Sequence, residues 1–197
     1  MPLFRSRPQL SPGERSRFRA ACAEAGVDPT VLALAHGTIA ARPSGAPGLS
    51  AEPPRGVAVT ALTTHLGYGD EDRWTLVGWH EIDRGGWNPE TFRLEIDQRG
   101  VVEAGLVRPG GRRHRIHLAD PYRVPEVMTE RVSATILFSR QVEMPESTTV
   151  LTVVARRDLG DQTITWLAVP SRGSAVDDPD VKAFAAAAVR RLRGEFG

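Results

Sequence analysis

The feature that most constrains this fold is a two-residue alternation in the middle of the chain. Phe92, Leu94 and Ile96 alternate with charged side chains over residues 92–97, as in a strand with one buried and one solvated face. The polar segment 97–100 ends in glycine and predicts a turn. Short apolar segments follow at 101–107 and 113–118. The region therefore predicts an antiparallel sandwich or barrel.

Other segments rich in apolar and β-branched residues predict further strands on both sides of this region. They are Val31–Ala40, Val57–Leu66, Trp74–Ile82, Val150–Ala155 and Thr163–Val169. The polar residues between the last two predict a hairpin, and Gly67–Asp72 predicts a turn. Residues 42–56 contain four prolines, and we interpret them as a long flexible loop.

Three segments have the start signals of helices. Ser11 can cap a helix that has Pro12 in its first turn and Glu14 completing a capping box, and Gly26 would end it. A second helix is predicted from Pro125 to about Phe138. A third begins at residues 178–180 and runs to about residue 193, where arginines suit the negative end of the helix dipole.

These elements predict an α+β chain of one principal domain, since 197 residues exceed the usual domain size only modestly. We divide it into an N-terminal helical segment (1–27), an antiparallel β domain with a capping helix (28–140), and a β-hairpin with a C-terminal helix packed on that domain (141–197).

Composition excludes several functional classes. The chain has 24 arginines and one lysine, Lys182, yet its net charge is only +1, so it has no global attraction for nucleic acid or anionic membranes. The single cysteine, Cys22, cannot form an internal disulfide, which fits a reducing compartment. We find neither a signal peptide nor an apolar run long enough to span a membrane, and therefore expect a cytoplasmic location.

Catalytic, cofactor and metal motifs are missing from the sequence. It has no dinucleotide-binding, Walker A or nucleophile-elbow motif. His80 and Glu81 begin like a zinc-protease motif, but Arg84 stands where the second histidine is required. His114 and His117 are three residues apart on a predicted strand and would point to opposite faces. We therefore predict no cofactor, no metal and no catalytic residue.

The densest basic segment is the best candidate for a ligand-binding site. It comprises Arg108, Arg112, Arg113, His114, Arg115 and His117. Around a hairpin tip these side chains could bind phosphate or a nucleic-acid backbone. The segment contains no aromatic residue that would stack on a base, so a solvated strand edge remains the alternative.

The segment 79–90 resembles a pattern in a family of small uncharacterised actinobacterial proteins related to bacterial pleckstrin-homology-like (PH-like) domains. It contains Trp79, an isoleucine three positions later and Trp87, followed by the alternating strand. Further similarities at 125–132, at Arg156-Arg157 and at Asp178-Pro179 extend the resemblance over residues 28–194. The resemblance implies a β-roll capped by a helix, followed by a hairpin and a last helix, and it implies no catalytic residue.

The sequence therefore predicts a non-enzymatic binding or adaptor module whose partner is a protein segment, held beside the capping helix or along a strand edge. Phosphate or nucleic-acid binding around Arg112–Arg115 is one alternative. Another is an enzyme that combines His65 or His80 with Glu81 or Asp83. The partner's identity and the oligomeric state are not predicted.

Overall fold

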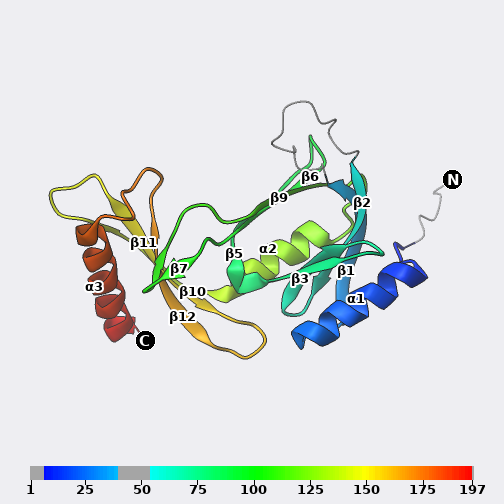
Figure 1. The fold of residues 1–197 in the computed structure, drawn as a ribbon, viewed down its shortest axis with the longest axis horizontal. Coiled ribbons are helices and arrows are strands. Elements are labelled where there is room, and N and C mark those ends of the chain that lie inside the picture. The colour runs from blue at the N-terminus through cyan, green and yellow to red at the C-terminus, as the bar shows by residue number, and fades with distance from the viewer. Residues whose placement is uncertain (1–6, 40–53, 197) are drawn as a thin grey trace.

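Residues 7–39 and 54–196 are described by the structure, a computed structural model, and they form two β-sheets and three α-helices (Figure 1). In spatial order, the first sheet contains β4 (Trp74–Gly78), β3 (His65–Gly69), β2 (Arg55–Leu62), β1 (Val31–Ile39), β9 (Arg113–His117), β6 (Arg93–Gln98) and β5 (Ile82–Asn88). The second contains β10 (Ile136–Glu143), β11 (Val150–Arg157), β12 (Ile164–Pro170), β8 (Leu106–Val107) and β7 (Val102–Glu103). Among the strands described here, β12 and β8 are the one pair that runs in parallel. The predicted α+β class is confirmed.

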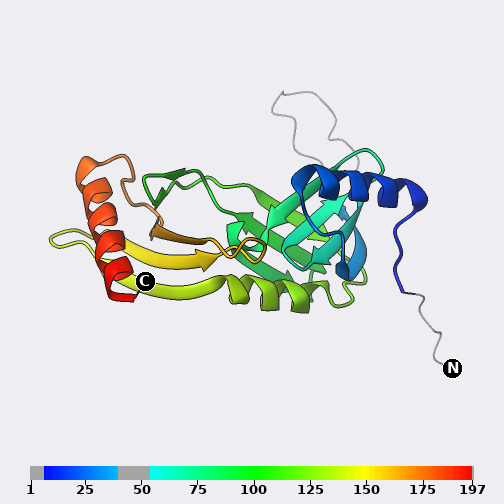
Figure 2. The same ribbon diagram turned by 90° about the horizontal axis from the view of Figure 1, so that it is seen from below.

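The first sheet packs helices on both of its faces (Figure 2). Helix α1 (Pro12–Ala25) covers one face through Phe18 and Cys22, which pack against Leu62. Helix α2 (Val124–Thr135) lies on the other face and buries Val127 and Met128 in the main core. Alternation along the strands explains this arrangement, because successive side chains serve opposite faces.

The predicted signals at the two ends of α1 are confirmed. The Ser11 hydroxyl accepts a hydrogen bond from the Glu14 amide at 3.1 Å, and the Glu14 carboxylate accepts one from the Ser11 amide at 2.8 Å. Gly26 ends the helix with a positive φ of 66°. Cys22 is buried, and burial is the main factor that raises its thiol pKa, so this residue contributes packing.

The second sheet is covered on one side by α3 (Pro179–Phe196). Val181, Ala185, Ala188 and Leu192 are its buried residues, at the spacing of one helix face. The predicted hairpin and final helix are confirmed; β11 and α3 are slightly longer than expected, and β12 is shifted by one residue. Strands β7 and β8, from the middle of the chain, also join this sheet.

The segment 101–107, predicted as one strand, is divided between β7 and β8 by a turn at Ala104 and Gly105. Three further predicted element boundaries are wrong. The segment 57–66 is divided between β2 and β3, and β3 continues through Gly67 and Gly69. A glycine is required at position 69, since a Cβ there would lie 2.3 Å from the Arg73 carbonyl oxygen. The predicted strand 74–82 is interrupted by a 3-10 turn, η1 (Trp79–Glu81), in which the Glu81 carboxylate accepts a hydrogen bond from the Gly78 amide.

The third wrong boundary is the end of the second helix. Helix α2 ends at Thr135 instead of continuing to Phe138, and the chain enters β10 directly. Three β-branched residues, Val132, Thr135 and Ile136, lie around this point and favour extended backbone. The Thr135 hydroxyl also donates a hydrogen bond to the Val132 carbonyl at 2.7 Å.

Most of the proline-rich loop predicted over 42–56 lies outside the described residues, and its last two residues, Arg55 and Gly56, begin β2. Within the described residues, no helix has both the length and the apolar character that crossing a bilayer requires.

We predict that Gly37→Ala destabilises the fold. A Cβ at Gly37 would lie 2.3 Å from the His117 carbonyl oxygen and 2.6 Å from a Leu118 methyl carbon, where β1 meets β9. Relieving such a clash has an expected cost of about 1–3 kcal/mol of unfolding free energy, which urea denaturation would measure.

Gly56→Ala is the matched control for this change. Gly56 lies opposite Thr38 in the neighbouring strand β2, and a Cβ there meets nothing within 4 Å. Its alanine variant should be as stable as the parent or slightly more stable. Equal unfolding free energies for the two variants would contradict the close approach described at Gly37.

Candidate functional site

Strand β1 is paired very differently on its two sides. It pairs with β2 from Val31 to Ile39, but with β9 only at Thr38 and Ile39. Among the described strands, residues 31–37 therefore have a neighbour on one side only. An edge of this kind presents backbone N–H and C=O groups that can accept another strand.

A hollow of about 330 Å³ lies beside the first half of this edge. Its lining residues come from the segment before α1, from β1 and from the start of α2: Arg7, Pro8, Val31, Leu32, Ala33, Leu34, Tyr122 and Arg123. A second hollow of about 240 Å³ shares Val31 with it and is lined by Gln9, Leu10, Arg15, Phe18, Arg19 and Pro29. We call the two hollows and the 31–37 edge together the β1 groove.

Within the described part of the chain, arginine is the only charged residue type that lines the two hollows of the β1 groove. Arg7, Arg15, Arg19 and Arg123 are all exposed there. Because the floor between them is apolar, the groove combines a hydrophobic surface with positive potential. Such a surface favours partners that carry apolar and acidic side chains.

The start of α2 is held at the groove by a tight turn. The Val124 amide donates a hydrogen bond to the Pro121 carbonyl. Tyr122 adopts a backbone φ of 47°, in the left-handed region that residues other than glycine rarely adopt. Arg123 occupies the N-cap position. The first turn of α2 therefore adds its positive helix-dipole end to the arginine charges.

The candidate ligand-binding arginines on β9 are paired with carboxylates of the adjacent strand β6. Arg113 donates two hydrogen bonds to Asp97, at 2.5 and 3.0 Å, and Arg115 lies 3.3 Å from Glu95. The hydrogen bonds and charge of Asp97 raise the pKa of Arg113. A phosphate would have to compete with these carboxylates for the same guanidinium groups.

Arg108 lies away from β9 and makes its own ion pairs. Its guanidinium is 2.7 Å from Glu103 and 2.6 Å from Asp177, and both contacts raise the pKa of Arg108. Arg112 is exposed just before β9. The structure therefore places the predicted basic segment at two locations, each accompanied by carboxylates.

The two histidines of the segment lie on opposite faces of β9, as alternation predicts. His114 is half-buried and lies 3.0 Å from the Tyr68 hydroxyl, whereas His117 is exposed beside the Phe92 ring. Over the residues that the structure describes, no three histidine, cysteine or acidic side chains are grouped to hold a metal ion.

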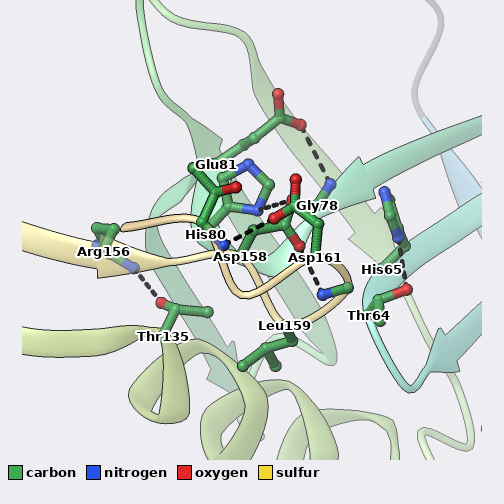
Figure 3. Close-up of polar contacts among 12 residues, drawn as sticks. Thr64, His65, Gly78, His80, Glu81, Thr135, Arg156, Asp158, Leu159 and Asp161 are labelled. Atoms are coloured by element: carbon green, nitrogen blue, oxygen red, sulfur yellow. Dashed lines mark hydrogen bonds and ion pairs between the residues drawn. The ribbon is translucent and has the colours of Figure 1, made fainter. Parts of the chain in front are cut away.

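The enzyme alternative placed His65 or His80 with Glu81 or Asp83, but these carboxylates make other contacts. Glu81 accepts the bond from the Gly78 amide, and Asp83 lies 3.2 Å from the Arg99 guanidinium. His80 instead faces Asp158, with 3.5 Å between Nδ1 and Oδ2 (Figure 3).

Asp158 belongs to the loop between β11 and β12 and was not predicted as a partner of His80. The carboxylate accepts a hydrogen bond from the Gly160 amide at 2.7 Å, and the neighbouring Leu159 packs against the core of the first sheet. The His80–Asp158 contact therefore fastens the second sheet to the first. A separation of 78 positions leaves no local signal from which to predict it.

The β1 groove was also missed as a set of residues, because its lining comes from three segments that are far apart in the sequence. Compared with protein-family models, curated proteins and solved structures, the chain matches none of them. Its function is therefore argued from the geometry of the β1 groove.

We predict that, because of His65, the free energy of unfolding falls as the pH is lowered below the ordinary pKa of a histidine side chain. Burial is the main factor that lowers the pKa of His65 in the folded chain. The unfolded chain then binds more protons than the folded one, so stability is fully present above about pH 6.5 and declines below it.

The measurement is urea denaturation of the parent and of His65→Gln near pH 7.5 and near pH 5. The glutamine variant should lose less unfolding free energy over this interval than the parent loses. Identical losses in the two proteins would contradict a buried, neutral His65.

Proposed function

We propose that this chain is a non-enzymatic binding module on a PH-like scaffold, and that its β1 groove takes an extended acidic segment of a partner protein. The observation that carries the proposal is the unpaired β1 edge between an apolar floor and exposed arginines. Strand addition at such an edge supplies affinity through the backbone and specificity through alternate side chains.

The order of elements supports the PH-like scaffold. Strands β1–β4 are consecutive neighbours, β5, β6 and β9 form a second antiparallel group, and α2 follows them in the chain. The two groups are joined where β1 pairs with β9. This is the arrangement expected of a curled roll that is closed by a helix.

The side chains of β1 suit an added strand. Ala33 and Ala35 are buried in the main core, Leu32 is half-buried against the same core, and Leu34 is half-buried. A bound segment would place alternate apolar side chains next to Leu34 and its acidic side chains within reach of Arg123. The sequence pattern it requires is an alternation of apolar and acidic residues.

The lining of the groove supports binding without catalysis. Among the described residues, the side chains that line the two hollows include no carboxylate, histidine, cysteine, serine or lysine, so none of these groups can act there as a general base or a nucleophile. On the 31–37 edge, His36 is exposed and its Nε2 lies 3.6 Å from the Glu14 carboxylate. The His80–Asp158 pair lies outside the groove, between the two sheets.

The test uses a displayed library of random linear peptides selected against the full chain, followed by fluorescence anisotropy with the enriched peptides. We expect enriched sequences to alternate apolar and acidic residues. The double variant Leu34→Asp, Arg123→Glu should weaken their binding about tenfold or more, because it places negative charge in the floor and at the rim.

Arg112→Glu is the matched control, since it makes the same charge change at an exposed arginine that lies outside the groove. It should leave peptide affinity unchanged. The proposal fails if no peptide is enriched, or if the enriched peptides bind the groove variant and the parent equally. Weaker binding by the Arg112→Glu variant alone would instead favour the basic segment.

A further inference from the structure

Strand β10 forms an outer edge of the second sheet. Among the described strands it pairs only with β11, over residues 136–143, and it contains no proline (Figure 1). All but two of its eight residues are exposed. Long edges of this kind are usually blocked in monomeric proteins, because their free backbone groups recruit other strands.

Apolar side chains gather along the same edge. Ile136 is 42% exposed, Leu137 is 46% exposed, and Phe196 at the end of α3 is 57% exposed. The Phe196 ring packs against that of Phe138, with 4.9 Å between ring centroids. An unpaired backbone and exposed apolar groups therefore occur together at one place on the surface.

We propose that a second copy of this chain pairs along β10, antiparallel and around a two-fold axis at Ser139, so that the second sheet continues from one subunit into the other. A two-fold axis between identical antiparallel strands passes through one residue and its own equivalent. This symmetry restricts the possible registers to those centred on a residue of β10.

The side chains select among these registers. An axis at Arg140 would place two like charges directly opposite each other, and an axis at Phe138 would place Arg140 opposite the apolar Ile136. With the axis at Ser139, Phe138 lies opposite Arg140 of the partner subunit, and this pair occurs twice. Each guanidinium can then stack on an aromatic ring.

The same register places Leu137 opposite Gln141 of the partner subunit. Both positions are exposed in the single chain, so they can be changed without disturbing a core. The inference concerns the second sheet alone and does not depend on peptide binding in the β1 groove.

The test is the mass of the full chain in solution, measured by size-exclusion chromatography with light scattering over a wide concentration range. We expect a concentration-dependent dimer of twice the 21.4 kDa chain mass. The double variant Leu137→Lys, Gln141→Lys should raise the dimer dissociation constant about tenfold or more, because it creates two like-charge pairs.

The double variant Leu137→Lys, Gln141→Glu should restore the dimer, because each lysine then faces a glutamate of the partner subunit. Ile164→Lys is a control for the loss of an exposed apolar side chain, since Ile164 is 52% exposed on β12 and away from this edge. It should leave the dimer unchanged.

Ser139→Cys gives a second measurement of the register. At the axis, the two new thiols should form an intermolecular disulfide on mild oxidation, whereas Ser133→Cys, exposed on α2, should not cross-link. A parent chain that stays monomeric at all concentrations, or a lysine–glutamate variant no more dimeric than the lysine–lysine variant, would overturn the proposal.

Discussion

The short contact between β1 and β9 is the constraint on which the rest of the structure depends. Pairing at Thr38 and Ile39 joins the two antiparallel groups of the first sheet, and Gly37 permits the close approach because no side chain stands in the way. Since the two strands then separate, the sheet curls around α2, which fills the space inside it with Val127 and Met128. The separation that makes room for the helix also leaves the first seven residues of β1 with an open edge.

The second sheet is attached to this framework by continuous chain and by buried polar contacts. Helix α2 leads directly into β10, and the buried Arg156 guanidinium donates a hydrogen bond to the Thr135 hydroxyl at the same junction, at 2.9 Å (Figure 3). Burial lowers the pKa of Arg156, and the nearby Arg99 acts in the same direction. Together with Leu159 in the first core and Asp158 at His80, these contacts restrict the relative movement of the two sheets.

Local sequence patterns were sufficient to predict the elements that are stabilised by interactions between residues close together in the chain. The capping box at Ser11, the alternation at 92–97 and the apolar face of α3 each result from interactions within one segment. The β-branched residues near Thr135 reduce the helix propensity at the predicted end of α2. The strand that forms there instead, β10, depends on pairing with β11. Arg113 and Arg115 looked available in the sequence because the carboxylates that pair with them, Asp97 and Glu95, lie on β6, about 16 to 20 positions earlier in the chain. Contacts between residues far apart in the chain therefore determine both the tertiary fold and whether the side chains of a candidate site are free to bind a ligand.

The edges of β1 and β10 differ in ways that suit different partners. The edge of β1 is recessed beside α2 and surrounded by arginines, so a second copy of the chain, which carries the same arginines, would be repelled there. The edge of β10 has Arg140 and Glu143 of opposite charge and stands at the border of its sheet, where a whole domain can approach without obstruction. This difference in charge and accessibility is the reason for proposing an acidic segment as the partner of the first edge and an identical subunit as the partner of the second.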